Sequence, residues 1–323
     1  MKILIYNSGG GLGDSIQLFD LITTLKAKFG YENLYYLSSH KNHFNNSLKD
    51  YNIYLKELKH NIIYFGFRWF HLFNSKKKIL EKNLIDKFDL IIDLQSKLRN
   101  TLILKQFPSN NFYSSTFNFK FCNKKKIFCS TKNEIKNIVL NIEKLIEIKI
   151  PFKKYSLSNI ENKFFDEAKK LLPDQNYVGF SITQGNEYRK KSWPLNKFIN
   201  IAKKISKQKK TPVFLIEKNN IELINKIKKE VNNAMFPELE TTLTGPPLVS
   251  ALSTRLQKVV SIDNGIMHMV GLANIPMIVL FGPTNSSKFA PKINNIDILD
   301  SKLIYNSDDI SKITEDDVLS LIQ

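Results

Sequence analysis

The sequence predicts an α/β protein built from two doubly wound domains with parallel sheets. Short apolar runs typical of buried strands alternate with segments whose apolar residues recur at helical spacing. This alternation stops over residues 150–175 and then starts again. A chain of 323 residues is also longer than most single domains. We therefore expect domains at 1–155 and 156–308, facing each other across a cleft and followed by a tail at 309–323.

The first half begins with the apolar run MKILIYN, which predicts a strand over residues 2–7. A helical pattern follows and ends at Gly30, a residue favoured just after a helix. The long helix at 130–149 would take Ser130 or Thr131 as its N-cap. The other expected elements in this half are helix 14–29, strand 32–39, helix 68–87 and strand 88–95.

Residues 150–175 contain two prolines and one polar helix, so we interpret them as a linker region. After the linker the pattern of alternating strands and helices resumes. The expected strands are 177–182, 212–216, 258–262 and 276–281, and the expected helices are 194–208, 219–232, 265–273 and 309–322. In such sheets, ligands bind at the carboxyl ends of the strands.

The composition limits the classes of function. The formal net charge is +18, yet only four of the 48 basic residues are arginines. Such a lysine excess is consistent with a solvated surface or with an anionic partner such as a membrane leaflet or a phosphorylated glycan. Nucleic acid is not expected, because no motif for it accompanies the charge. No export signal or apolar run of about 20 residues is present, so we expect a cytoplasmic protein, with peripheral contact at the inner membrane as one candidate.

The turn after the first strand is the first candidate site. Gly11 and Gly13 lie in a glycine-rich run that ends at Asp14. A dinucleotide-binding fingerprint would need a third glycine where Asp14 stands. The aspartate could simply cap the following helix. Capping does not explain the glycines, which allow a ligand to approach the backbone closely, so we favour Asp14 as a general base.

The segment DLIIDLQSKLRN offers a second group of polar residues in the first half. Asp93, Gln95 and Arg99 follow a strand and are expected at the same edge of the sheet as Asp14. An ordinary polar strand end explains them equally well.

A third candidate site lies in the second half, where a strand ends at Asp263 and Asn264-Gly265 turns into a helix that carries His268. The free N–H groups of residues 265–267 would form a seat for phosphate. Lys191, just before a helix start, could neutralise a diphosphate leaving group, although such a lysine is often only a surface residue. The other candidate donor-binding residues in neighbouring loops are Thr183, Gln184 and Thr284.

Taken together, the motifs GLGD, DLIIDLQSKLRN, RKKSWPLNKF and SIDNGIMHMVGLANIPMIVLFGPT resemble glycosyltransferase family 9, the ADP-heptose-dependent heptosyltransferases of lipopolysaccharide core assembly. The resemblance spans residues 1 to about 290 and implies a GT-B fold of two Rossmann-like domains. It also implies an inverting, metal-independent transfer, with Asp14 as the base. Lys191 would lie near the donor phosphates, and Asp263 and His268 in the donor-binding turn. The tail helix 309–323 would pack back toward the first domain.

Three segments depart from the family pattern. Leu18, Phe19 and Asp20 replace a usual threonine and proline. Residues 181–186 (SITQGN) replace a His-Pro-Gly-type loop, and residues 217–220 (EKNN) replace a Gly-Gly-Pro-acid turn near the nucleotide. Because of these changes, the sequence does not determine which nucleobase and which sugar the donor carries.

We therefore expect an inverting glycosyltransferase that moves a sugar, with heptose as the first candidate, from a nucleotide-diphosphate donor to a lipopolysaccharide-core or related surface-glycan acceptor. No metal and no other cofactor is expected. Two alternatives stay open: a nucleotide-sugar epimerase on the same fold, and a non-catalytic sugar-binding or assembly protein.

Overall fold

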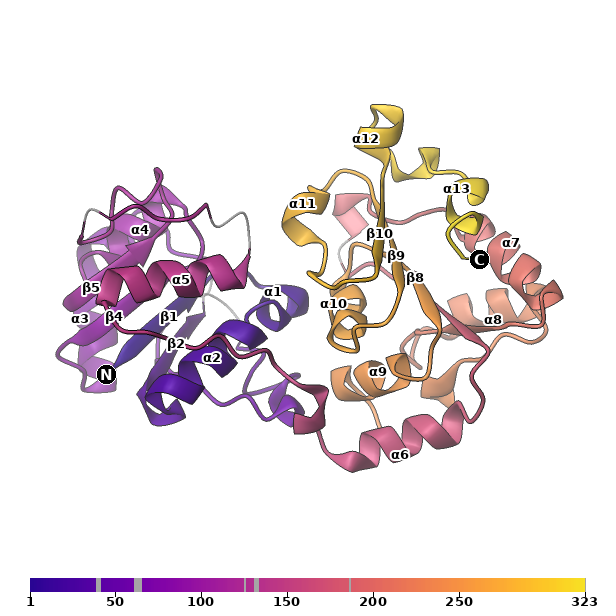
Figure 1. The fold of residues 1–323 in the computed structure, drawn as a ribbon, viewed down its shortest axis with the longest axis horizontal. Helices are drawn as coiled ribbons and strands as arrows, with labels where there is room; N and C mark the ends of the chain where they lie inside the picture. The colour runs from indigo at the N-terminus through magenta and orange to yellow at the C-terminus, as the bar shows by residue number, and fades with distance from the viewer. Residues whose placement is uncertain (39–41, 61–65, 125, 131–133, 186, 323) are drawn as a thin grey trace. The chain divides into compact units, whose positions relative to one another are not determined.

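A computed structural model describes residues 1–323 with the exception of 39–41, 61–65, 125, 131–133, 186 and 323. The chain forms two compact units, Met1–Tyr155 and Ser156–Gln323. Each unit contains one sheet with helices around it (Figure 1). None of the helices in the described residues has both the length and the apolar composition of a membrane span.

The sheet of the first unit has five strands in the order β3-β2-β1-β4-β5, and all neighbouring strands are parallel. The order reverses beside β1, since β2 and β3 extend the sheet to one side and β4 and β5 to the other. In parallel sheets such a switch point opens a crevice where ligands bind. The strands are β1 (Ile3–Asn7), β2 (Leu34–Ser38), β3 (Lys56–Glu57), β4 (Phe88–Asp93) and β5 (Ser109–Ser114).

Helices cover both faces of this sheet. On one face, α3 and α4 contribute Ile79, Ile103 and Leu104 to a core that also contains Phe88 and Phe112 of the strands. On the other face, α2 and α5 contact each other. The α-helices are α1 (Leu12–Ile16), α2 (Phe19–Phe29), α3 (His71–Asn83), α4 (Leu98–Leu104) and α5 (Ile135–Ile146).

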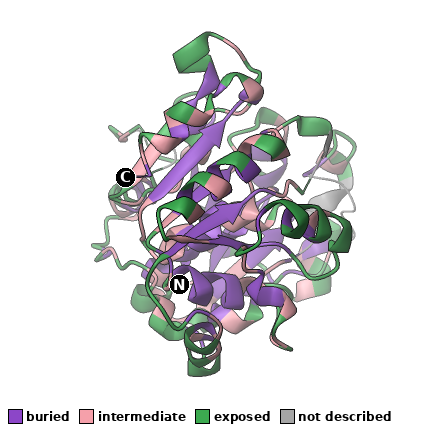
Figure 2. Cartoon of the chain, turned by 90° about the vertical axis from the view of Figure 1, so that its right-hand side faces the viewer, coloured by how far each residue is buried: buried purple, intermediate pink, exposed green. Residues whose placement is uncertain are grey.

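The second unit repeats this plan with the strand order β10-β9-β8-β6-β7, again parallel throughout. Its switch point lies between β6 and β8. The central strands of this sheet, β6, β8 and β9, are largely buried (Figure 2). The strands are β6 (Tyr177–Ser181), β7 (Thr211–Phe214), β8 (Lys258–Ile262), β9 (Met277–Phe281) and β10 (Ile296–Asp300). The α-helices are α6 (Asn162–Leu171), α7 (Leu195–Lys207), α8 (Ile221–Glu230), α9 (Pro246–Ser253), α10 (Gly265–Leu272), α11 (Ser286–Phe289), α12 (Ser301–Tyr305) and α13 (Glu315–Leu319).

The expected strands are present, and the elements that the sequence did not predict are polar or short. Strand β5 has the sequence SNNFYS, and only its last three residues are buried, so its apolar signal is weak. The expected helix 14–29 is divided in two, because α1 ends at Ile16 and α2 starts at Phe19. Helix α5 begins at Ile135, after the expected N-caps; Ser130 lies outside the helix, and Thr131 lies outside the described residues.

The tail contributes apolar side chains to the core of the second unit, and its packing toward the first unit stays a prediction. Ile310, Ile313, Val318 and Ile322 are buried in the hydrophobic core of the second unit. The Trp193 indole N–H donates to the Ile313 carbonyl at 3.0 Å, and Lys197 Nζ donates to the same oxygen at 2.7 Å. The tail is not one continuous helix, because a 3₁₀ turn at Ile310–Lys312 precedes α13. Its apolar residues complete a core that helices α7 and α8 leave open.

Candidate active site

The turn after β1 presents Asp14 at the carboxyl end of the first sheet. Gly11 is the N-cap of α1, and Asp14 is the third residue of this short helix. The Gly11 N–H donates to Asp14 Oδ2 at 3.2 Å. The carboxylate therefore satisfies one of the N–H groups that a helix start leaves without an intrahelical acceptor. This is the contact that the interpretation of Asp14 as a helix cap predicted.

The glycines allow the turn to lie directly against this carboxylate. A Cβ atom on Gly9 would lie 2.7 Å from Asp14 Cβ, and one on Gly11 would lie 3.0 Å from Asp14 Oδ2. Contacts below 3 Å are too short for real Cβ atoms, so any other residue at position 9 would push the aspartate aside. Close packing around Asp14 thus explains the glycines at positions 9 and 11 and restricts where the carboxylate points.

Asn7, which the sequence analysis missed, holds this turn to the neighbouring strand. Its Oδ1 accepts hydrogen bonds from the Gly9 N–H at 3.0 Å and from Gln95 Nε2 at 2.5 Å. Since Asn7 ends β1 and Gln95 follows β4, the second bond crosses the switch point of the sheet. The available signal was a polar residue at the end of an otherwise apolar strand. Asn7 and Gln95 together position the glycine turn.

Asp93, which was predicted to lie on the acceptor side, is buried and hydrogen-bonded within the first unit. Its side chain is 1% exposed and accepts hydrogen bonds from Thr101 Oγ1 at 2.5 Å, Ser114 Oγ at 2.9 Å and the Gln95 N–H at 3.0 Å. Burial raises the pKa of this carboxyl above its ordinary value, although these hydrogen bonds lower it. Any contribution of Asp93 to a site would act through Gln95.

Arg99 lies near the start of α4 and is half-buried. Its Nε atom is buried and has no hydrogen-bond partner within the part of the chain that the structure describes. Arg99, Gln95 and Asp14 all follow the carboxyl ends of β1 and β4. The sequence placed them correctly at one edge of the sheet, and their contact with an acceptor stays a prediction.

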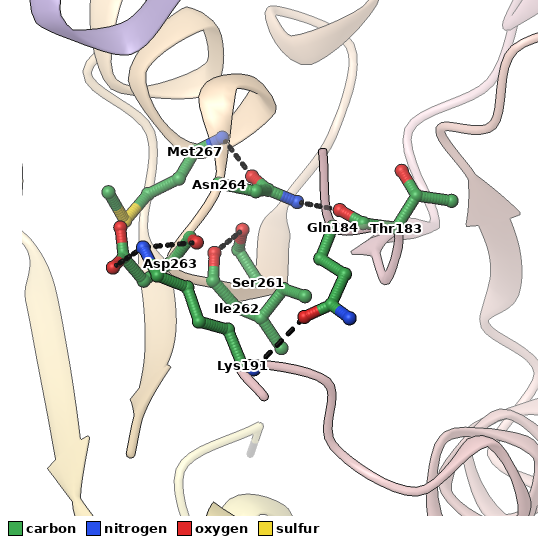
Figure 3. Close-up of polar contacts among 8 residues, drawn as sticks. All are labelled: Thr183, Gln184, Lys191, Ser261, Ile262, Asp263, Asn264 and Met267. Carbon is green, nitrogen blue, oxygen red and sulfur yellow. Dashed lines mark hydrogen bonds and ion pairs between the residues drawn. The ribbon is translucent and has the colours of Figure 1, made fainter. Parts of the chain in front are cut away.

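In the second unit, Asn264 joins the two strands at the switch point (Figure 3). It is the N-cap of α10, and its Oδ1 accepts from the Met267 N–H at 2.8 Å. Its amide nitrogen donates to Ser181 Oγ and to the Thr183 carbonyl, both at 2.8 Å. The loop after β6 is thereby fixed against the start of the helix after β8.

Lys191 lies at the same place, where its Nζ pairs with the Asp263 carboxylate (Figure 3). The two side chains are only 12% and 7% exposed. The Lys191 backbone N–H donates to Gln184 Oε1 at 2.9 Å, so the loop 183–191 is closed by one of its own side chains. A buried cation is therefore held directly beside the N-terminus of α10.

The predicted phosphate seat of residues 265–267 is smaller than expected. Asn264 already occupies the Met267 N–H, which leaves those of Gly265 and Ile266, since a helix offers them no internal acceptor. His268 is 7% exposed on the first turn of α10. Thr284 follows β9 at the same edge, and its hydroxyl is buried with no partner in the described ranges.

The sequence analysis also missed Glu238, a carboxyl group close to Glu217, which follows β7. Glu238 is 7% exposed, and burial together with the charge of Glu217 raises its pKa to about 7. Glu217 opens the EKNN segment that departs from the family pattern. Within the described residues, no group of three or more His, Cys, Asp or Glu side chains could hold a metal ion.

Comparison with known proteins identifies the fold. The model of the family "Glycosyltransferase family 9 (heptosyltransferase)" matches residues 78–316. A glycosyl transferase family 9 structure from Veillonella parvula is 17% identical, with a TM-score of 0.66 over 99% of this chain and 96% of that one. E. coli heptosyltransferase WaaC with ADP is 13% identical, with a TM-score of 0.65 over 100% and 97%. The search of curated proteins found no match.

A different activity is found on a related fold. The UDP-GlcNAc 2-epimerase from Methanocaldococcus jannaschii is 12% identical and has a TM-score of 0.52 over 100% of this chain and 92% of that one. Identities this low show the fold alone, which is the GT-B fold with two Rossmann-like units. The family match covers well over half of the 323 residues. Two parallel α/β units, each with polar groups at its switch point, and this match together show that the chain belongs to glycosyltransferase family 9.

Proposed function

We propose that this protein is an inverting glycosyltransferase that transfers a sugar from a nucleotide-diphosphate donor to a hydroxyl of a lipopolysaccharide-core or related surface-glycan acceptor. Heptose is the first candidate for the sugar and ADP-heptose for the donor. E. coli WaaC has been solved with ADP and with ADP-2-deoxy-2-fluoro heptose, which supports this choice.

The observation that carries the proposal is the buried Lys191 beside the start of α10. A diphosphate leaving group gains negative charge as its bond to the sugar breaks. Lys191 and the N–H groups of Gly265 and Ile266 are fixed donors that would stabilise this charge without reorganising. On this proposal the donor binds to the second unit, with His268, Thr183, Gln184 and Thr284 lining the same edge.

The acceptor would bind to the first unit near Asp14. The acceptor hydroxyl attacks the anomeric carbon, a C–O bond forms, the bond to the diphosphate breaks, and the hydroxyl proton passes to the Asp14 carboxylate. A single displacement of this kind inverts the anomeric configuration. The bond from Gly11 N–H and the packing of Gly9 would keep the carboxylate in place for this step.

The experiment is a transfer assay in which the protein is incubated with ADP-heptose, other nucleotide sugars and lipopolysaccharide-core acceptors. Release of nucleoside diphosphate and a mass increase of the acceptor by one sugar residue would support the proposal. The anomeric configuration of the product, measured by NMR, would test inversion. Donor binding without transfer to any acceptor would contradict it and favour a sugar-binding protein, whereas formation of free sugar-nucleotide isomers would favour an epimerase.

On this proposal the acceptor is a glycan or glycolipid built on the cytoplasmic side of the inner membrane, and the enzyme works there without metal or other cofactor. Adding a chelator to the transfer assay checks the last point. We expect the rate to be unchanged, because Lys191 and the N-terminus of α10 would stabilise the leaving diphosphate in place of a metal ion.

A further inference from the structure

Three large aromatic side chains are exposed where helix α3 begins. Trp69, Phe70 and Phe73 are 54%, 59% and 82% exposed. Large aromatic side chains normally bury most of their area, and a group of them on a surface indicates that the surface binds something apolar. We call these three residues the aromatic patch.

The aromatic patch is not a consequence of a loosely attached segment. Phe67, immediately before it, is fully buried and stacks on Tyr6 with ring centroids 5.2 Å apart. Leu72 and Ile79 of α3 pack in the core of the first unit. The segment therefore has an inner apolar side that anchors it to the protein and an outer side that carries the aromatic patch.

Basic residues follow the aromatic patch along α3. Between residues 68 and 82 the sequence contains one arginine, four lysines and one acidic residue, Glu81. Lys77 is 82% exposed, and its pair with Glu81 at 4.0 Å is a weak surface contact. Exposed aromatics next to several cations are typical of segments that lie at the surface of an anionic membrane, where rings enter the headgroup region and lysines contact the lipid charges.

The aromatic patch also lies at the edge of the sheet that carries Asp14. Helix α3 leads into β4, so its start lies toward the carboxyl ends of the parallel strands and its end toward their beginnings. Helices α3 and α4 contact each other; burial lowers the pKa of His71 at the start of α3, and the charge of Arg99 in α4 lowers it further. A membrane bound here would be next to the proposed acceptor side.

We propose that the aromatic patch, with Lys77, Lys78 and Lys82 of α3, is a docking surface for a lipid bilayer that contains anionic headgroups. This goes beyond the proposed function, because it concerns attachment to a membrane and not the transfer of a sugar. On this proposal, part of the positive net charge of +18 contacts anionic headgroups at this surface.

The chain provides its own probe for this surface. Its two tryptophans are Trp69 and Trp193, and Trp193 is only 2% exposed in the core of the second unit. Vesicles whose acyl chains carry bromine quench tryptophans that enter the bilayer. With vesicles of phosphatidylcholine and phosphatidylglycerol we expect a blue shift and quenching of Trp69 emission. High salt, or vesicles of phosphatidylcholine alone, should greatly reduce both signals.

Sedimentation with the same vesicles tests individual residues. Phe73→Ser should weaken binding about tenfold, because a large apolar side chain no longer enters the interface. Leu84→Ser is the matched control: Leu84 is 91% exposed, but it lies at the other end of α3, so binding should be unchanged. Replacing Lys77 and Lys78 by glutamine should weaken binding about fivefold for each lysine. The same change at Lys169 and Lys170 in α6 should have little effect.

Three results would overturn the proposal. One is the absence of vesicle binding, and another is binding that Phe73→Ser and Leu84→Ser weaken equally. The third is self-association in ultracentrifugation that Phe73→Ser abolishes, which would make a second copy of the chain the occupant. Vesicle binding requires no donor, so a protein that binds vesicles but transfers no sugar would contradict only the proposed function.

Discussion

At the scale of single residues, Asp14 combines a structural contact with a proposed chemical role. Its Oδ2 accepts from the Gly11 N–H, while Gly9 packs against its Cβ. A carboxylate held in this way loses little entropy when a substrate hydroxyl approaches, because its orientation is already fixed. The cap and the proposed base are therefore compatible, and a substitution that keeps one and removes the other can separate them.

Asp14→Asn makes this separation. The amide oxygen can still accept from the Gly11 N–H and its size fits the same space, so the variant should fold and bind donor normally. It cannot take the hydroxyl proton, so kcat should fall by roughly 10²–10⁴. Steady-state kinetics and a thermal melt measure the two effects. A normal rate with a lower melting temperature would mean that Asp14 only caps α1.

Lys191 is the second residue whose role can be isolated. Lys191→Ala removes a cation from the proposed diphosphate site and should cost about 1.5–3 kcal/mol of donor affinity or transition-state stabilisation. The substitution also leaves the buried Asp263 without its partner, which destabilises the fold. The double variant Lys191→Ala with Asp263→Asn removes both charges, so it should recover stability but not activity.

The neighbouring Lys190 is the control for this series, because it is exposed. Lys190→Ala should keep the donor affinity and the rate of the parent protein. Calorimetry with the donor and a transfer assay compare the variants. Equal losses for Lys190→Ala and Lys191→Ala would reduce both lysines to a general electrostatic contribution.

At the scale of elements, a 3₁₀ turn that follows α8 contains a carboxyl group whose charge opposes folding. Glu238 lies in the 3₁₀ turn Pro237–Leu239, and burial next to Glu217 raises its pKa to about 7. Between its ordinary pKa and 7, the folded state keeps the proton that the unfolded state has lost. Stability therefore falls as the pH rises through this range and is constant above it.

Glu238→Gln should remove this pH dependence. Near pH 4 the variant and the parent should be equally stable, and the variant should become more stable by up to about 3 kcal/mol as the pH approaches 7. Denaturant unfolding at several pH values measures the difference. Glu240→Gln is a suitable control, because Glu240 is exposed and close in sequence. A constant difference between the two proteins at all pH values would show that Glu238 does not titrate in this range.

At the scale of the whole molecule, each unit has its own hydrophobic core. The tail belongs to the core of the second unit, where Ile313 is fully buried and its carbonyl accepts from Trp193. A change in the tail should therefore act on the unit that binds the donor and leave the first unit intact. Trp193 in the second unit and Trp69 in the first report on the two parts separately.

Ile313→Ala should lower the stability of the second unit by about 2–5 kcal/mol, the usual cost of a cavity at a buried isoleucine. The transition followed by Trp193 emission should shift, and the transition followed by Trp69 should not. Leu303→Ala, at a position that is 80% exposed, should change neither. A shift confined to the Trp69 transition would contradict the contribution of the tail to the core of the second unit.

The sequence by itself determined the class of fold, both units and the position of their boundary near residue 155. Parallel strands buried on both faces are continuous apolar runs, such as ILIYN and MIVLF, and such runs can be recognised locally. It also predicted Asp14, Asp263 and Asn264 after strand ends, because a polar residue after an apolar run marks the edge of a parallel sheet, and Lys191 just before a helix start. The family motifs lie at these same positions.

Only the tertiary structure decided which of these residues contact each other. The bonds from Gln95 to Asn7 and from Asn264 to Ser181 join residues more than 80 positions apart, and strand order, not local sequence, brings them together. The same holds for the tail, because its apolar spacing does not by itself specify the core that it joins. Its partner was decided by which core lacked a side to bury, because burial depends on the surface left open by the rest of the fold.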